Sequence, residues 1–581
     1  MSPLAPAPLA SDTIISASWV DYLIVAIYFG FVLGIGLMAR RHVSDSVDFF
    51  LSGRSLPAWV TGLAFISANL GAVEIMGMSA SGAEFGLPTV HYFWVGAIPA
   101  MLFLGIVMMP FYYGSEVRSV PEFMFRRFGT GAHLVNAVSF AVAQLLIAGI
   151  NLYLLGSIIQ ALLGIDLLLA VVIAAVIVLS YITLGGLSAA IYNEVLQFFV
   201  IVAALTPLTL LGLDRVGGWQ GLKDGITETA GRGDAPSAAA QLNSWPGNAL
   251  TGFDSDLLSV VGIVFGLGFV LSFGYWTTNF VEVQRAMATD SISSARKTPI
   301  IGAFPKMFVP FITIIPGMIA AVLVAEIAEV KAGGSVSGGA EGSVTYNDSL
   351  IYLMRDVLPN GLLGVAIAGL LAAFMAGMAA NVSAFNTVLS YDLWERYVVK
   401  DRSDGYYLRV GRWATVAAAV IAVFTAQLAA SFSNIMDYLQ TLFGFFNAPL
   451  FATFILGMFW KRMTPTAGWA GLVSGTLAAV FVGFLAEGTL GSLSIGVLPL
   501  SGQGAAFVAA GVAFAVDIAV SVAVSLVTEP KPAEQLVGLV YSETPKEDLV
   551  DEQEKTFPWY QRTLPLAGLA AVLTIILNLA F

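Results

Sequence analysis

Two apolar stretches of this sequence carry polar side chains that a lipid-facing helix would lack. Residues 64–82 (AFISANLGAVEIMGMSASG) contain Asn69 and Glu74, and residues 265–285 (FGLGFVLSFGYWTTNFVEVQR) contain Glu282, all near glycine, serine or threonine. Ionisable groups within membrane helices are costly, and they commonly line a ligand or ion pathway. We therefore predict that both stretches contribute to a binding site for a small solute.

The glycines in both stretches predict helices that are interrupted in the middle of a membrane. An interruption frees backbone carbonyls for a cation and helix ends for polar ligand groups. Such backbone persists only where protein or a water-filled cavity surrounds it. Close helix packing through small residues is the alternative interpretation. The amide of Asn69 and the carboxyl of Glu74 beside the glycines favour a binding site.

Lys306 lies in the middle of a further apolar stretch, residues 298–326. An unpaired ammonium at that depth costs about 2.5 kcal/mol or more. We therefore predict an ion pair between Lys306 and Glu74 at the substrate cavity, with a purely structural pair as the alternative. Glu282 is predicted to be a solvated vestibule residue. Asp437 is predicted to line the inner cavity.

The composition indicates that membrane helices position these groups. The chain has 581 residues, of which 57% are hydrophobic and 11% charged, and its mean hydropathy is +0.84. A soluble protein needs more polar surface, so this excess indicates many membrane spans. The net charge of −12 arises from acids in loops, and the sequence contains no cysteine and three dispersed histidines. Metal chemistry is therefore not expected, and no basic, aromatic-rich patch indicates nucleic acid.

A bilayer core of about 30 Å needs about 20 apolar residues per helix. Applied along the chain, this length predicts fourteen transmembrane helices at residues 19–40, 57–83, 88–111, 131–162, 165–184, 188–213, 256–284, 298–326, 350–393, 407–431, 435–460, 464–487, 504–528 and 563–581. No loop between them is long enough for a second sizeable domain. We therefore predict that residues 1–581 form a single transmembrane domain, with a cytoplasmic loop at 529–561.

The basic residues predict how this domain is oriented. If the N-terminus lies outside, twenty of the 26 lysines and arginines fall on the cytoplasmic side. The five that face outside are Arg215, Lys223, Arg232, Lys331 and Arg355. This distribution satisfies the positive-inside rule. We predict a multi-pass protein of the plasma (inner) membrane that contacts the lipid bilayer and functions as a monomer.

The interrupted stretches belong to the second and seventh predicted spans, which are five spans apart. This spacing is typical of a five-plus-five inverted repeat in which each repeat begins with a broken helix. The expected fold class is accordingly an all-α polytopic membrane protein.

Eight short motifs connect the chain to a known family. In order they are DFFLSGRSLPAW (48–59), SANLGAVEIMGMSASG (67–82), RSVPEFMFRRF (118–128), TLGGLSAAIYNEVLQ (183–197), YWTTNFVEVQRAMA (275–288), FPKMFVPF (304–311), SYDLWERY (390–397) and GMFWKRMTPTAGWAGLVSG (457–475). With these motifs the chain resembles the sodium:solute symporter family, particularly its bacterial sodium/sugar (galactose) cotransporter branch. The resemblance implies a LeuT-type fold with ten core helices within 57–487, an extra N-terminal helix at 19–40 and peripheral helices within 504–581.

The resemblance also implies a substrate site. Tyr275 matches the aromatic inner gate of the family, and Lys306 and Gln440 match two sugar-contacting side chains. Asn69 lies on the same face of the first broken helix, and Tyr92 offers a ring that can stack on a sugar, although such aromatics commonly serve packing.

At four other positions the chain departs from the sugar-binding relatives. Glu74 replaces a glutamine, Phe93 a glutamate, Ser272 an asparagine and Gly96 a serine. An unpaired buried hydroxyl is costly. The loss of two polar groups therefore argues against galactose recognition identical to that of the family.

A cation site is implied in the same way. Three backbone carbonyls of the family's sodium site correspond to Ser67, Leu70 and Ala373. The two hydroxyl positions correspond to Ala376 and Gly377, which have no side-chain oxygen. Water, Ser383 or Glu194 would have to complete the set, and Glu194 occupies a position where the family keeps an acid near this site.

We predict a secondary active symporter that imports a small polar solute, with a sugar or polyol as the leading substrate class. A sodium gradient drives the import by alternating access, and Na+ is the only cofactor expected. The alternatives are proton coupling through Glu74 or Glu194, an amino compound or organic cation attracted by Glu74, and a solute sensor with the transporter fold. An enzyme is not expected, because no nucleophile–base set or Gly-x-Ser-x-Gly motif stands out.

Overall fold

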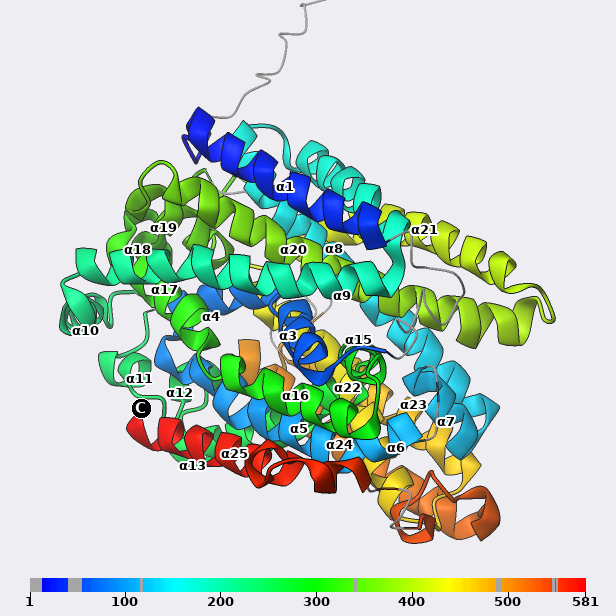
Figure 1. Ribbon diagram of the computed structural model, residues 1–581. Coiled ribbons are helices and arrows are strands. Elements are labelled where there is room, and N and C mark those ends of the chain that lie inside the picture. The colour runs from blue at the N-terminus through cyan, green and yellow to red at the C-terminus, as the bar shows by residue number, and fades with distance from the viewer. Residues whose placement is uncertain are drawn as a thin grey trace, which may run out of the picture.

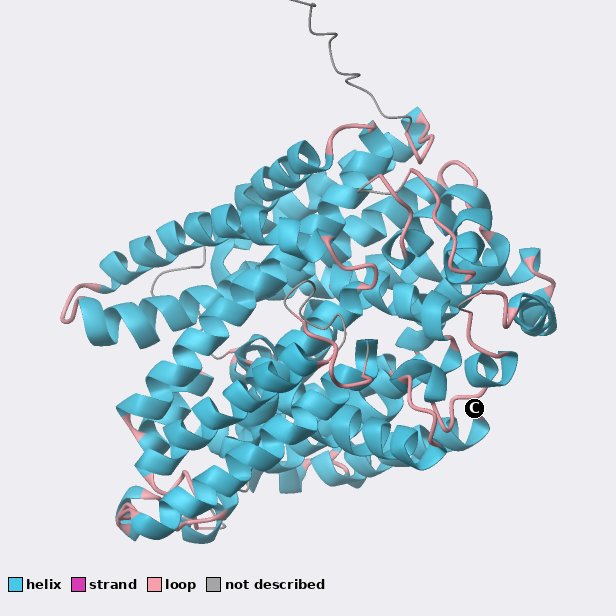
Figure 2. Ribbon diagram, turned by 180° about the vertical axis from the view of Figure 1, so that it is seen from behind, coloured by secondary structure: helices cyan, strands magenta, loops and turns pink. Residues whose placement is uncertain are grey.

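The computed structural model describes residues 13–39, 55–114, 117, 119–233, 235–338, 342–486, 494–500, 502–545, 549 and 552–581. Within these ranges every regular element is a helix, and the helices are joined by loops (Figure 2). Most of the motif at 48–59 lies outside the described residues, as do the basic residues Arg40, Arg41, Arg54, Arg118 and Lys546.

The helices follow one another along the chain as Figure 1 labels them. The first half contains α1 (Trp19–Ala39), α3 (Ala58–Asn69), η3 (Val73–Gly77), α4 (Met78–Phe85), η4 (Leu87–Val90), η5 (Tyr92–Ala97), α5 (Ile98–Phe103), η6 (Leu104–Met108), α6 (Met109–Gly114), α7 (Val120–Phe128), α8 (Thr130–Leu163), α9 (Leu167–Arg215), α10 (Gly218–Thr229), α11 (Ala238–Leu242), α12 (Asn248–Thr251), α13 (Asp256–Val261), η7 (Gly262–Ser272), α14 (Phe273–Thr278) and α15 (Phe280–Met287). The second half contains α16 (Ile292–Lys306), α17 (Val309–Leu323), α18 (Ala325–Lys331), η8 (Tyr346–Asp348), α19 (Ser349–Val357), α20 (Leu362–Thr387), η9 (Val388–Val398), α21 (Asp404–Ala430), α22 (Ile435–Phe459), α23 (Pro465–Leu485), α24 (Gly502–Val527), η11 (Ala533–Gln535), η12 (Tyr541–Glu543), η14 (Glu552–Thr556), η15 (Trp559–Gln561) and α25 (Thr563–Ala580).

Eleven helices in the described ranges are long and apolar enough to cross a membrane, and a twelfth span forms if the bent pair 58–69 and 73–85 is counted as one. Two shorter apolar helices, Trp19–Val32 and Leu167–Leu179, coincide with the remaining two predicted spans. The chain is therefore a polytopic α-helical membrane protein, and fourteen as the number of spans stays a prediction.

Two boundaries differ from the prediction. The predicted spans 165–184 and 188–213 both fall within α9, and no loop separates them. A straight helix of that length would measure about 74 Å, more than twice a bilayer core. The predicted span 350–393 instead begins at Leu362, because Pro359 forces Leu358 into an extended conformation and Gly361 adopts a positive φ of 88°.

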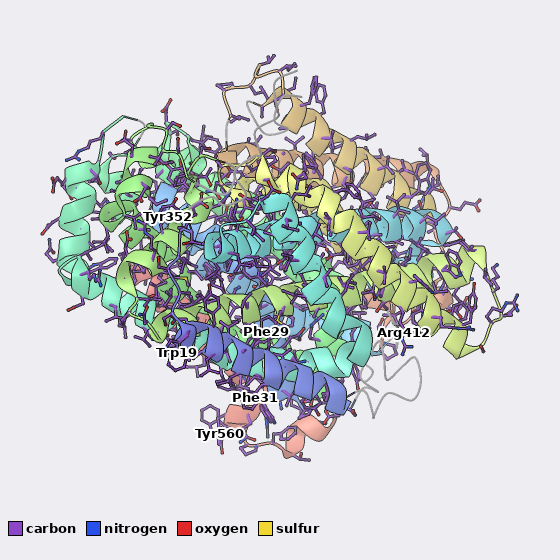
Figure 3. The ribbon with its side chains drawn as sticks, turned by 90° about the horizontal axis from the view of Figure 1, so that it is seen from above. Trp19, Phe29, Phe31, Tyr352, Arg412 and Tyr560 are labelled. Carbon is purple, nitrogen blue, oxygen red and sulfur yellow. The ribbon has the colours of Figure 1, made fainter. Side chains whose placement is uncertain are left out.

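The broken helices lie inside the molecule, and the last helices lie at its edge. α3 is close to the centre in Figure 1, with α1 and α25 on opposite sides. In the most apolar part of the span 362–398, which contains α20, 89% of the residues are buried. In the most apolar part of α25 only 22% of the residues are buried. Figure 3 shows Trp19 and Phe31 of α1 on the outside, where large apolar side chains suit a lipid-facing surface.

Candidate functional site

The first membrane helix of the core breaks directly after Asn69. The amide of Leu70 still donates to the carbonyl of Ile66 at 2.8 Å, and the next regular bond runs from Ile75 to Gly71 at 3.1 Å. Between them, no helical bond joins the amide of Gly71 to Ser67 or that of Glu74 to Leu70 among the described residues. The helix axis turns by 56° at this point. The predicted interruption is confirmed.

Gly71 explains where this break lies. A Cβ atom on Gly71 would come within 3.3 Å of the Cα of Gly377 in α20. The break therefore packs closely on α20, and a side chain at either position would require its neighbour to shift by a few tenths of an ångström.

The second interruption is at Asn279, between α14 and α15. Asn279 has extended backbone angles (φ −72°, ψ 114°), and its side-chain oxygen accepts a hydrogen bond from the amide of Val281 at 3.1 Å. The Thr278 hydroxyl donates to the carbonyl of Gly274 at 2.6 Å. Side chains thus satisfy part of the backbone that the break leaves unpaired.

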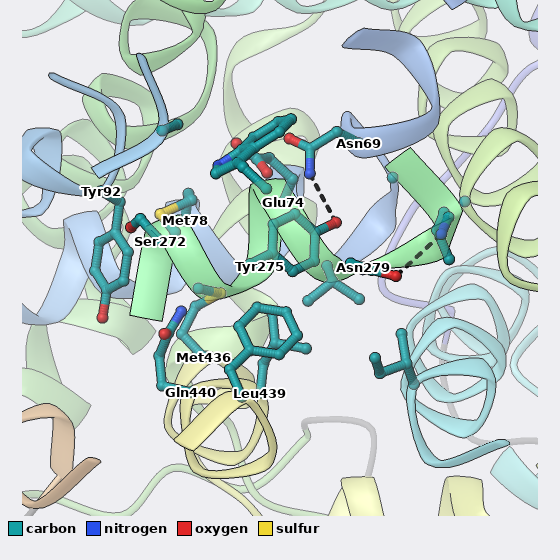
Figure 4. A pocket seen from close by; sticks show the side chains of 18 of the residues that line it. Asn69, Glu74, Met78, Tyr92, Ser272, Tyr275, Asn279, Met436, Leu439 and Gln440 are labelled. Atoms are coloured by element: carbon teal, nitrogen blue, oxygen red, sulfur yellow. Dashed lines mark hydrogen bonds between the residues drawn. The ribbon is translucent and has the colours of Figure 1, made fainter. Parts of the chain in front are cut away.

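A cavity of about 100 Å³ lies between these interrupted helices. All seven residues predicted to bind the substrate line it: Asn69, Glu74, Tyr92, Ser272, Tyr275, Lys306 and Gln440. Figure 4 shows Asn69, Glu74 and Tyr275 on one side of this space, with Gln440 across from them. The sequence therefore identified groups that the fold brings together, and the role of each stays a prediction.

Lys306 and Glu74 form the predicted ion pair. The Nζ of Lys306 lies 2.5 Å from Oε1 of Glu74 and also donates to the side-chain oxygen of Asn69. The same Nζ is 5.0 Å from the ring of Phe93 and 5.2 Å from that of Trp276. The phenylalanine that replaces a polar residue of the family thus adds a cation–π contact to the ammonium.

Tyr275 extends this network away from the cavity. The amide nitrogen of Asn69 donates to the Tyr275 hydroxyl at 3.0 Å (Figure 4), which in turn donates to Oε1 of Glu282 at 2.8 Å. Glu282 is fully buried, so its interpretation as a solvated vestibule residue is wrong. The physical reason is its place in the first turn of α15, where the extended backbone at Asn279 directs the carboxyl back toward Tyr275.

Glu194 has a base as its partner. Arg285 donates to both carboxyl oxygens of Glu194, at 2.6 and 3.3 Å, and both side chains are fully buried. Glu194 is not among the residues that line the cavity. Among the other residues of the predicted cation site, Gly377 lines the cavity. Ser67 is buried in α3, and Leu70 is buried directly after the end of that helix. Ala373 and Ala376 are buried in α20.

Sequence reasoning missed or misplaced several polar partners. Tyr92 donates to the side-chain oxygen of Gln503 in α24, whose amide donates to Asp437. Asp437 does not line the cavity, so that prediction is wrong; as a first-turn residue of α22 it lies at the end of its helix. Asn151 and Asn381 do line the cavity. Both side-chain amides lie in long apolar helices. Asn69 was predicted to bind a ligand because it is a polar residue within an apolar stretch, and the same criterion applies to Asn151 and Asn381.

Comparisons with known proteins agree with this geometry. The model of the sodium:solute symporter family matches residues 49–475. The sodium/glucose cotransporter of Vibrio parahaemolyticus is 29% identical over 476 residues, which cover 81% of this chain and 86% of the relative. The sodium/myo-inositol cotransporter 2 of Rattus norvegicus is 28% identical over 471 residues, which cover 79% and 69%.

A solved structure supports the fold assignment. The substrate-bound, outward-open state of a Na+-coupled sialic acid symporter superposes with a TM-score of 0.70 at 18% identity, covering 88% of this chain and 98% of the other. At that identity the likeness concerns the fold alone, and it confirms the predicted LeuT-type architecture.

Proposed function

The chain belongs to the sodium:solute symporter family, whose members are transporters and not enzymes, and we propose that it imports a neutral sugar or polyol together with Na+. Import would proceed by alternating access at the cavity between the two interrupted helices. We further propose that the protein lies in the plasma membrane with its N-terminus outside and functions as a monomer.

The cavity lining is the observation that carries the proposed substrate class. Asn69, Ser272 and Gln440 offer donors and acceptors, and the ring of Tyr275 lies beside them. Amides and hydroxyls suit the hydroxyl groups of a sugar or polyol, and an aromatic ring suits its apolar face. The Glu74 carboxyl already has the Lys306 ammonium as its partner. This pairing favours a neutral solute over an organic cation.

Sodium coupling is favoured by the charge partners of the two candidate proton carriers. Glu74 accepts from Lys306 and Glu194 accepts from Arg285, so neither carboxyl is free to take up a proton while its pair is intact. Carbonyl oxygens at the break after Asn69 lack regular helical bonds and can serve a hard cation.

The test uses the full chain in proteoliposomes under two imposed gradients, one of sodium and one of protons. We expect labelled glucose or myo-inositol to accumulate above its equilibrium level with an inward sodium gradient, and not with a proton gradient in sodium-free buffer. A preceding thermal-shift screen of sugars, polyols, amino acids and carboxylates, with and without Na+, selects the solute. Accumulation driven by protons alone would refute sodium coupling. Solute binding without accumulation would indicate a sensor.

A further inference from the structure

The predicted cation site lacks the side-chain oxygens that α20 would be expected to provide. At the two positions that correspond to hydroxyl ligands, the chain has Ala376 and Gly377. Three carbonyl oxygens alone make an incomplete ligand set for a hard cation, which needs several oxygen ligands. Glu194, the acid predicted to help, is bound on both oxygens by Arg285. Water, Ser383 or another side chain would then have to supply the missing ligand.

Asn151 in α8 has an oxygen without a partner. Its side chain is 2% exposed, and its Nδ2 donates to the carbonyl of Ile147 at 3.0 Å. Its Oδ1 is buried and accepts no hydrogen bond from any described residue. Buried polar atoms are nearly always paired, so the free Oδ1 of Asn151, which lines the cavity with Gly71 and Gly377, is available to a ligand there.

This oxygen lies where α20 and the first helix break meet. A Cβ atom on Gly377 would be 3.1 Å from Oδ1 of Asn151, and one on Gly71 would be 3.7 Å from it. The Gly71 Cβ position is also 3.8 Å from the carbonyl oxygen of Ala373. Asn151 therefore fills, from a third helix, the space that a side chain at position 377 would occupy.

We propose that Asn151 is a ligand of the coupling cation and replaces the hydroxyl oxygens that α20 lacks. Its Oδ1 would join the carbonyls of Ser67, Leu70 and Ala373 in a site built from uncharged oxygens, which suits a monovalent ion such as Na+. Because these ligands come from three helices, the ion would join α8 to α20 and to the break after α3. This inference rests on the proposed sodium coupling.

The experiment compares Asn151→Ala with Asn136→Ala in the full-length protein. Asn136 lies on the same helix, is also buried and also has an unpartnered Oδ1, but does not line the cavity that contains Gly71 and Gly377. Two readouts are measured: the thermal stabilisation of detergent-purified protein by NaCl against choline chloride without solute, and the sodium concentration for half-maximal uptake.

We expect Asn151→Ala to raise the half-saturating sodium concentration by about tenfold or more and to abolish the stabilisation by NaCl. Asn136→Ala should change the sodium dependence by less than about twofold. Adding Gly377→Ser to Asn151→Ala places a hydroxyl in the vacated space and should recover part of the sodium affinity. If Asn151→Ala does not fold, Asn151→Leu keeps the size of the side chain without its oxygen, and it should lose the stabilisation by NaCl in the same way.

Two outcomes overturn the assignment. Sodium dependence within about twofold of the unchanged protein in Asn151→Ala or in Asn151→Leu would show that Oδ1 is not a ligand, and undiminished stabilisation by NaCl in either variant would show the same. If the unchanged protein itself shows no sodium dependence, the proposed coupling fails, and the inference about Asn151 fails with it. The sodium dependence of the unchanged protein therefore distinguishes a failure of the proposed coupling from a failure of the Asn151 assignment alone.

Discussion

Carboxyl groups are buried in two regions of this protein, and their surroundings differ. Beside the cavity, Glu282 accepts a hydrogen bond from Tyr275 on Oε1, while its Oε2 has no partner in the described part of the chain. In the peripheral helices, Asp517 of α24 accepts from Thr453 at 2.8 Å on one oxygen and from Ser521 at 3.1 Å on the other. Glu282 is incompletely bonded and Asp517 has a donor on each oxygen.

The glycines of the two regions differ in the same way. Around Asp517, glycines of α23 permit tight packing: a Cβ on Gly471 would lie 2.0 Å from the Ser521 hydroxyl oxygen and 2.7 Å from Oδ1 of Asp517. At the cavity, Gly71 accompanies a broken helix and unpaired backbone groups. Neither a buried acid nor a glycine identifies a site by itself. A broken helix together with unsatisfied polar atoms does, because those atoms are then available to a ligand.

The largest effect is expected for Lys306→Met, which leaves the Glu74 carboxyl without its base. Loss of one partner of a buried ion pair costs about 3–5 kcal/mol. We expect the initial rate of solute uptake, measured in proteoliposomes at equal protein content, to fall by about tenfold or more, equivalent to about 1.4 kcal/mol. Near-normal uptake would remove Lys306 from the functional site.

The double variant Glu74→Gln/Lys306→Met separates a binding role from a structural one. It removes both charges and keeps side chains of similar size, so the fold should recover toward the stability of the unchanged protein. Uptake should remain low, because the polar groups that face the cargo are altered. Recovery of both stability and uptake would show that the pair only joins two helices.

A smaller effect is expected for Glu282→Gln. Glu282 interacts electrostatically with both ion pairs, Lys306–Glu74 and Arg285–Glu194, and the three acids and two bases together have a formal excess of one negative charge when all are ionised. Glutamine keeps an acceptor for Tyr275 but removes that excess, which weakens the attraction for a cation nearby. We expect the half-saturating sodium concentration to rise about threefold to tenfold. An unchanged value would place Glu282 in the same structural role as Asp517.

Much of the site could be predicted because the bilayer imposes strong rules. An apolar run of fixed length predicts a span, and an ammonium within one requires a counter-charge, which identified Glu74 as the partner of Lys306. The partners of Tyr92 could not be predicted. Gln503 is 411 residues away in a peripheral helix, and their contact depends on the rotation of each helix about its axis. An evenly apolar span carries little information about that rotation.

The direction of Glu282 was unpredictable for a related reason. The extended backbone of one residue, Asn279, sets the direction of the helix that follows. The sequence indicated that this stretch is interrupted, but it did not indicate the backbone angles at the interruption. The orphaned oxygen of Asn151 likewise depends on the close approach of Gly71 and Gly377, which come from distant parts of the chain.

The smallest effect on transport is expected for Asp517→Asn. This variant tests whether a buried carboxyl with a donor on each oxygen has a purely structural role. Asparagine keeps one acceptor oxygen but presents an amide to one of the two hydroxyl groups, each of which can rotate to accept instead. Because α24 carries no break and Asp517 does not line the cavity, uptake should stay within about twofold of the unchanged protein, equivalent to less than about 0.5 kcal/mol. Thermal unfolding in detergent should show a loss of about 1–3 kcal/mol at most, the usual cost of a disturbed buried hydrogen bond. A large loss of uptake in a stably folded Asp517→Asn protein would mean that a carboxyl with a donor on each oxygen can still take part in transport. Hydrogen bonding would then not distinguish the peripheral region from the cavity region.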